Sequence, residues 1–139
     1  MSTLLLTHRA CLLHDPGDYH PECPDRLRAV LQALDQEDFS ALIRDEAPEA
    51  SIEQLCRVHP RNYVDAILGI RPPPGETVAL DGDTAMSHGS AEAALRAAGA
   101  GVHAVDAVMR GEVRRAFCAS PRSSSSWPMS AAKVMISAS

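Results

Sequence analysis

The apolar positions of this chain follow two spacings, one typical of buried strands and one typical of helices. Residues 3–8 (TLLLTH) form a short apolar run that predicts a buried first strand. Apolar residues then recur at i, i+3, i+4 and i+7 from Leu27, which predicts an amphipathic helix beginning at Pro24. A second apolar run at residues 115–119 (RAFCA) predicts another strand. Two apolar strands separated by helices indicate an α/β fold with a parallel sheet.

The clearest helix is predicted over residues 88–110. Its apolar side chains keep the helical period throughout: Ala91, Ala94, Leu95, Ala98, Val102, Val105 and Met109. Gly99 and Gly101 lower helix propensity, so we expect them to pack closely against another backbone. Gly111 is a suitable C-terminal stop.

Shorter elements fill the middle of the chain. Ser51 can cap a short helix that has Glu53 near its start, and residues 62–70 predict a further helix. The stretch 71–75 (RPPPG) predicts a surface loop, which residues 81–84 (DGDT) continue with turn chemistry.

Composition narrows the class of protein. A length of 139 residues suits one domain, and with 4% aromatic residues we expect a core of Ala, Leu, Val and Ile. The net charge of −5 is spread along the chain without a basic stripe or a basic amphipathic helix, which argues against nucleic-acid and membrane partners. Residues 4–6 (LLL) are too short for a signal peptide or a membrane span, so we expect a cytoplasmic protein. The oligomeric state is left open.

The four cysteines form no C-x-x-C pair. They are Cys11, Cys23, Cys56 and Cys118. Reduced, scattered thiols are the favoured interpretation, with a disulfide or a cysteine-based zinc site as alternatives.

Residues 14–26 (HDPGDYHPECPDR) hold the densest set of reactive side chains. Two histidines, three aspartates, a glutamate and an arginine occur there between prolines and a glycine, as in a binding or rim loop. A solvated connector is the alternative, and metal binding by His14, His20 and an acid is a weaker one. Asp81 and Asp83 are spaced as in a calcium loop, but no glutamate stands at its closing position. His59 before Pro60 favours a turn, and residues 123–126 (SSSS) lack the glycines of a nucleophile elbow.

Taken in order, four segments resemble the N-terminal part of the histone deacetylase family. The likeness is greatest to its bacterial class II-like deacetylases and acetylpolyamine amidohydrolases. Residues 14–27 are similar to the family's first loop with its H-P-E-x-P-x-R-L signature, and residues 55–64 to its L-x-x-V-H-x-x-x-Y segment. Residues 81–87 are similar to its D-x-D-T loop, and residues 91–111 to the Ala- and Gly-rich helix that follows.

This resemblance implies a fold, a reaction and site residues. The fold is the N-terminal portion of the three-layer α/β/α arginase/deacetylase-like architecture around a parallel sheet. The family reaction is zinc-dependent hydrolysis of N-acetyl amides such as acetyl-lysine or acetylpolyamines. By resemblance His20 and Pro21 line the wall of the substrate pocket, and Arg26 lies below the acetyl group. Asp83 lies at the rim, where it accepts hydrogen bonds from the substrate backbone.

The resemblance stops after residue 119. The family continues there with Arg-Pro-Pro-Gly-His-His, whose histidines are the catalytic pair, and its zinc ligands (an Asp-x-His and a second Asp) come later. This chain continues with Ser120-Pro121-Arg122 and has neither motif after Ala119. We therefore expect a partial deacetylase domain over residues 1–119 and an aberrant, disordered tail over 120–139. No catalytic residue and no zinc are expected in this chain, which we interpret as a truncated, inactive member of the family.

A frameshift offers a specific explanation of the departure. Residues 119–124 can be encoded by GCG TCC CCC CGG TCA TCA followed by T. Read one base later, these bases give CGT CCC CCC GGT CAT CAT, which encodes Arg-Pro-Pro-Gly-His-His.

The alternative to a truncated enzyme is a non-catalytic α/β module that binds a protein partner through exposed helix faces.

Overall fold

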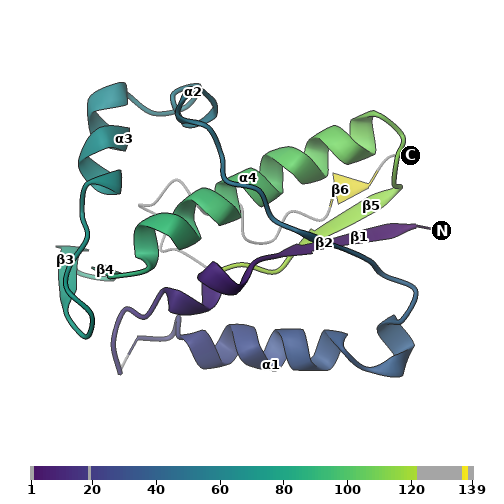
Figure 1. Ribbon diagram of the computed structural model, residues 1–139, viewed down its shortest axis with the longest axis horizontal. Helices are drawn as coiled ribbons and strands as arrows, with labels where there is room; N and C mark the ends of the chain where they lie inside the picture. The colour runs from purple at the N-terminus through teal and green to yellow at the C-terminus, as the bar shows by residue number, and fades with distance from the viewer. Residues whose placement is uncertain (1, 19, 122–135, 138–139) are drawn as a thin grey trace.

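A mixed sheet with one long helix on each face forms the body of the chain (Figure 1). The structure, a computed structural model, describes residues 2–18, 20–121 and 136–137. The strands are β1 (Thr3–Thr7), β2 (Ile43–Glu46), β3 (Thr77–Asp81), β4 (Thr84–Ser87), β5 (Arg115–Cys118) and β6 (Ile136–Ser137). The helices are α1 (Pro24–Leu34), α2 (Ile52–Leu55), α3 (Arg61–Leu68) and α4 (Ser90–Met109), with 3₁₀ turns η1 (Arg9–Leu13) and η2 (Glu37–Phe39).

Strand β1 lies in the middle of the sheet, whose order is β2-β1-β5-β6. It pairs in parallel on both sides, with Leu4 opposite Ile43 of β2 and Ala116 of β5. Strand β6 is antiparallel to β5 and places Ile136 opposite Ala116. The predicted parallel sheet is thus confirmed for its first three strands, and β6 makes the whole sheet mixed.

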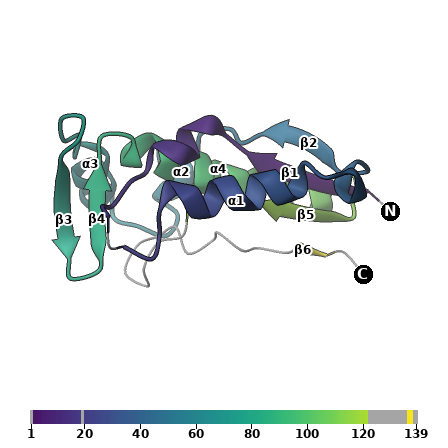
Figure 2. The ribbon, with the colours of Figure 1, turned by 90° about the horizontal axis from the view of Figure 1, so that it is seen from below.

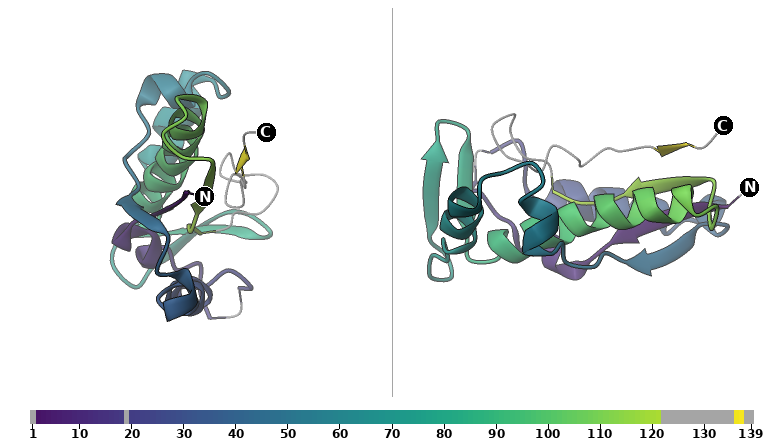
Figure 3. Two further views of the ribbon diagram at one scale, coloured as in Figure 1. Left: turned by 90° about the vertical axis from the view of Figure 1, so that its right-hand side faces the viewer. Right: turned by 90° about the horizontal axis from the view of Figure 1, so that it is seen from above.

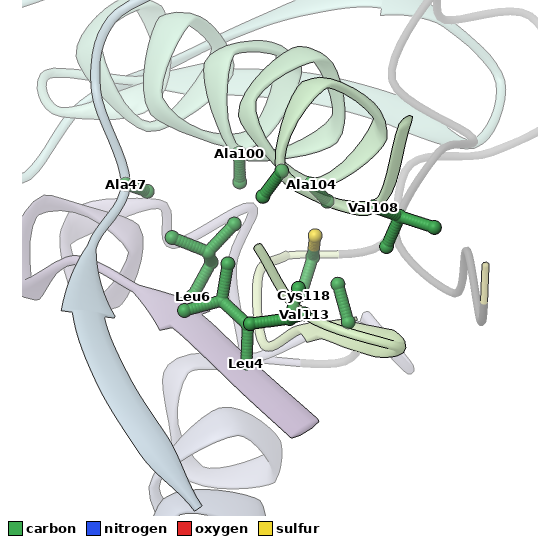
Figure 4. Packing of buried hydrophobic residues seen from close by; sticks show 10 residues of the cluster. Leu4, Leu6, Ala47, Ala100, Ala104, Val108, Val113 and Cys118 are labelled. Atoms are coloured by element: carbon green, nitrogen blue, oxygen red, sulfur yellow. The ribbon is translucent and has the colours of Figure 1, made fainter. Parts of the chain in front are cut away.

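Alternation along β1 divides the core between the two faces of the sheet. The end-on view of Figure 3 shows α1 and α4 on opposite sides of the strands. Leu4 and Leu6 point toward α4, and Leu5 points toward α1, since successive strand residues face opposite sides. Figure 4 shows the α4 side, where small side chains let the helix lie close to the sheet. That cluster consists of Leu4, Leu6, Ala47, Ala100, Ala104, Ala107, Val108, Val113, Ala116 and Cys118. The core is made of short aliphatic side chains, as the composition predicts.

Helix α4 is crossed by the backbone of residues 48–50. A Cβ placed on Gly99 would lie 1.9 Å from the carbonyl oxygen of Pro48, so a side chain does not fit there. The N–H of Ala50 donates to the carbonyl oxygen of Leu95 at 2.9 Å, which fixes this segment on the helix. Close backbone packing at Gly99 is therefore confirmed.

The helix ends where the sequence predicts. Gly111 adopts φ +74°, a left-handed conformation that glycine takes without strain. Its N–H donates to the carbonyl oxygen of Val108, and that of Glu112 donates to the carbonyl oxygen of Ala107, each at 3.0 Å. These two bonds form a Schellman C-cap.

Four of the described strands, β2, β3, β4 and β6, were not predicted. Residues 77–81 and 84–87 form the antiparallel hairpin β3–β4, so the expected surface loop extends only to the residues before Thr77, and Gly82 and Asp83 form the hairpin turn. Strand β2 (IRDE) is exposed at all four positions and carries no apolar run that periodicity detects. Charged residues are common on edge strands because they discourage pairing with other chains.

Most of the predicted tail, 120–139, lies outside the described residues. Within it, Ser120 and Pro121 are buried, and residues 136–137 pair with β5. Among the helices that the structure describes, none combines the length and the apolar character needed to cross a bilayer.

Candidate functional site

The loop after β1 and the chain after β5 leave the sheet at the same edge. The Thr7 hydroxyl donates to the carbonyl oxygen of Ala119 at 2.9 Å, and the Ala119 N–H donates to the carbonyl oxygen of Leu6 at 2.8 Å. In α/β folds, ligands bind outside the carboxyl ends of parallel strands. Figure 2 shows the β3–β4 hairpin at this end of the molecule. The loop, the hairpin turn and the end of β5 therefore define the candidate site.

His20 connects the loop to the hairpin turn. Its Nε2 lies 2.8 Å from the carbonyl oxygen of Asp83, and its Nδ1 lies 3.1 Å from the backbone nitrogen of Glu22. Because the carbonyl oxygen of Asp83 can only accept, Nε2 carries a proton and donates it in this bond. Nδ1 is placed to accept the Glu22 N–H, and it also lies 3.3 Å from the Glu22 carbonyl oxygen. Both ring nitrogens are thus engaged.

Glu22 and Arg26 form a bidentate ion pair at the start of α1. Arg26 donates to the two carboxylate oxygens from Nε at 2.8 Å and from Nη2 at 2.9 Å. Pro24 at the first helical position begins α1, so Arg26 lies in the first turn of the helix and Glu22 just before the N-cap residue. Nη2 also donates to the carbonyl oxygen of Ser120 at 3.1 Å. The arginine therefore joins the loop to the segment that follows β5.

His14 anchors the first half of the loop to the start of α4. Its Nδ1 lies 2.7 Å from Oγ of Ser90, which also accepts the N–H of Ser87 at 2.7 Å. The Ser87 hydroxyl accepts the Asp15 N–H at 3.0 Å and donates to the carbonyl oxygen of Leu13 at 3.2 Å. Burial lowers the pKa of His14, because desolvation disfavours the charged ring. Nδ1 of the uncharged ring can accept a hydrogen bond from the Ser90 hydroxyl.

Asp83 lies exposed in the hairpin turn beside Asp81. A hydrogen bond between the two carboxyl groups raises the pKa of Asp83, and the charge of Asp81 adds to the shift. The Asp83 N–H also donates to the Asp81 carboxylate at 3.0 Å. The pair presents oxygen acceptors to solvent at the tip of the hairpin.

Three of the four predicted site residues belong to one hydrogen-bonded assembly. Asp83, His20 and Arg26 are connected through Glu22, whereas Pro21 is exposed between them. Sequence reasoning missed the role of Glu22. Its position four residues before Arg26, across a helix start, is the signal that identifies the pair.

An open pocket of about 440 Å³ lies beside this assembly rather than within it. It is bounded by the first half of the loop, the Pro-rich segment before β3 and the start of α4. Its lining residues are Leu13, Asp15, Gly17, Asp18, Pro74, Gly75, Glu76, Thr77, Ser87, His88 and Gly89. None of the four predicted site residues contributes to this lining.

The described residues do not fit a zinc site. Within residues 2–18, 20–121 and 136–137, no three His, Cys, Asp or Glu side chains gather as metal ligands. All four cysteines are free thiols, in agreement with the reduced state predicted from their spacing. Burial raises the pKa of Cys11 and of Cys118 to about 11, so both stay protonated.

Comparison with known proteins identifies the family. Residues 20–123 match the family described as the histone deacetylase domain. The chain belongs to the histone deacetylase family. Two relatives are the type-2 histone deacetylase 2 of Dictyostelium discoideum, 31% identical over 84% of this chain, and the histone deacetylase-like amidohydrolase of Pseudomonas aeruginosa, 34% identical over 70%. A probable deacetylase of Archaeoglobus fulgidus is 31% identical over 84%.

The fold agrees with this membership. The crystal structure of the HDA15 HD domain matches 86% of this histone deacetylase family chain with a TM-score of 0.76 and 27% identity. The α/β architecture predicted by resemblance is therefore confirmed for the part of the deacetylase fold present here. The chain spans 35% of that domain and 8%, 26% and 33% of the three relatives.

Proposed function

We propose that this chain forms the entry wall of the substrate pocket in a histone deacetylase-like amidohydrolase. The observation that carries the proposal is the assembly of His20, Glu22 and Arg26, which joins the hairpin turn to the end of β5 at the carboxyl edge of the parallel strands. Substrates of the family reaction are N-acetyl amides such as acetyl-lysine or acetylpolyamines. A cytoplasmic location fits either substrate.

Within this wall each side chain has a separate task. Arg26 is held by Glu22, and its side chain is still partly exposed, so that it can face a polar group bound above it. The exposed Asp83 carboxylate can accept N–H groups of a substrate backbone at the rim. Pro21, exposed next to His20, offers an apolar surface.

We further propose that the 139 residues do not hydrolyse acetyl amides by themselves. The described residues hold no set of zinc ligands, and no histidine, cysteine, aspartate or glutamate occurs in residues 120–139. In the family, zinc supplies polarisation of the amide carbonyl and activation of water. The purified chain with one equivalent of zinc is expected to show no turnover of acetyl-lysine peptides or acetylpolyamines. Turnover above a protein-free control overturns this part of the proposal.

A chimera tests the wall itself. Residues 1–119 would be joined to the part of the Pseudomonas aeruginosa amidohydrolase that follows its matched segment, with the intact relative as control. Zinc-dependent deacetylation by the chimera, reduced at least tenfold by Arg26→Ala, is the expected result. A folded chimera that has no activity contradicts the proposal and favours the non-catalytic binding module.

A further inference from the structure

We infer that Glu22 is the positioning residue of this wall, holding Arg26 with its side chain and His20 with its backbone. The inference rests on the proposed deacetylase pocket for its functional meaning, whereas the contacts themselves are observed in the structure. It differs from the family resemblance, which assigns roles to His20, Pro21, Arg26 and Asp83 and none to the glutamate between them.

The burial of Glu22 is the first argument. Its side chain is 7% exposed, while the Arg26 side chain that binds it is 32% exposed. A buried carboxylate is costly without a charged partner and full hydrogen bonding, so the glutamate binds the arginine at both oxygens. The two bonds fix the plane of the guanidinium group, because a bidentate pair allows a single orientation.

The geometry of Arg26 is the second argument. Nη2 divides its donors between the Glu22 carboxylate at 2.9 Å and the carbonyl oxygen of Ser120 at 3.1 Å. Without the carboxylate, one hydrogen bond to a carbonyl would have to hold a side chain with several rotatable bonds. Glu22 thus fixes the position of the arginine relative to the chain that leaves β5.

The backbone of Glu22 holds His20, and through His20 it holds the hairpin turn. The Glu22 N–H donates to Nδ1 of His20, which leaves the Nε2 proton for the carbonyl oxygen of Asp83. This bond favours the tautomer with its proton on Nε2, and that proton holds the hairpin turn. Glu22 thus begins two branches of contacts. The side-chain branch leads to Arg26, and the backbone branch leads through His20 to the hairpin turn. They use different atoms of Glu22, so substitution can separate them.

Two variants of the 139-residue chain separate the branches by NMR and hydrogen exchange. Glu22→Gln removes the charge and keeps the backbone N–H. It is expected to shift the Arg26 Nε–H resonance and to speed its exchange at least tenfold, since hydrogen bonds between charged groups are the strong ones. The amides of residues 82–84 should be unchanged. His20→Ala should do the reverse, with about fivefold faster exchange in the hairpin turn and an unchanged Arg26 signal.

Glu76→Gln is the matched control, because it removes the same charge from an exposed glutamate. Should Glu22→Gln unfold the chain, Arg26→Lys keeps the positive charge without the bidentate geometry and should alter the backbone signals of Ser120. An Arg26 Nε–H signal in Glu22→Gln identical to that of the parent chain overturns the inference, as does equal disturbance of both branches by both variants. These readouts do not involve catalysis, so an inactive chimera would defeat the proposed function without affecting them.

Discussion

Gly99 is the position where adding a single methyl group should lower the stability of the fold the most. Its missing Cβ makes room for the carbonyl oxygen of Pro48 and the N–H of Ala50, which are backbone atoms and cannot rotate away. A side chain there must separate residues 48–50 from α4 and lengthen the bond from Ala50 to Leu95.

Gly99→Ala is therefore expected to lower the free energy of unfolding by about 3 kcal/mol, as overpacking of a rigid contact does. The gain in helix propensity, about 1 kcal/mol, does not offset it. Urea denaturation followed by circular dichroism measures the change. Gly82→Ala is the control, since no atom lies within 4 Å of its Cβ position. Equal losses in both variants would contradict the close packing.

His14 makes the stability of the fold depend on pH. Burial lowers its pKa in the folded chain, with Glu22 and Asp15 opposing the shift and His20 supporting it. A proton therefore binds the unfolded chain more readily than the folded one. The stabilisation that results is complete above the ordinary histidine pKa of 6.5 and is lost as the pH falls from there toward the lower folded-state pKa.

His14→Gln should flatten this dependence. The free energy of unfolding, measured from pH 7.5 to pH 5, is expected to fall less steeply in the variant than in the parent chain. The reason is that glutamine can still bond Ser90 but takes up no proton. Identical slopes for the two proteins would show that His14 is not responsible.

Among the elements, α2 depends most on its cap. Ser51 accepts the N–H of Gln54 at 3.1 Å, and the Gln54 side chain accepts the N–H of Ser51 at 2.8 Å. This capping box satisfies two donors in a helix of four residues, which has little hydrogen bonding of its own. The sequence predicts the cap at Ser51, and the structure adds its reciprocal bond.

Ser51→Ala is expected to cost about 1 kcal/mol of stability because the Gln54 N–H loses the hydroxyl oxygen that accepts it. Ser51→Asp, which keeps an acceptor at the cap, should remain close to the parent chain. Thermal and urea denaturation of the two variants provide the measurement. A Ser51→Ala variant as stable as Ser51→Asp would mean that the cap adds nothing.

The elements also show what a sequence can and cannot predict. Helix α4 is predictable because its small apolar residues hold one period over its whole length, and β1 because three leucines have no polar neighbour between them. Strand β2 is missed because its pairing uses backbone atoms while its side chains remain in solvent. The contact of His20 with Asp83 spans 63 residues, and no local pattern encodes it.

At the scale of the whole molecule, two cysteines report on the opening of the core. Cys11 packs with the cluster on the α1 side of the sheet and Cys118 with the cluster on the α4 side. Both are 1% exposed, and burial raises the pKa of each to about 11. Cys23 and Cys56 are partly exposed.

Labelling with a thiol reagent at pH 8 should therefore proceed in two phases. Cys23 and Cys56 are expected to react first, and Cys11 and Cys118 at least a hundredfold more slowly, because they must wait for the sheet to open. Mass spectrometry of digested samples assigns each phase. In denaturant all four should react together, and a fast Cys118 in the native chain would contradict the packing of α4 on β5.

The central place of β1 has a consequence for how this chain is made. Its first partner, β2, is complete by residue 46, but the bond from Thr7 to Ala119 joins residues that are 112 positions apart. A ribosome adding about 5–20 residues per second needs roughly 6–22 s to cover that distance. During this interval β1 can pair with β2 alone, because β5 is not yet complete. Folding of this chain is therefore timed by translation, and chaperone binding to nascent chains should be greatest before residue 119 emerges.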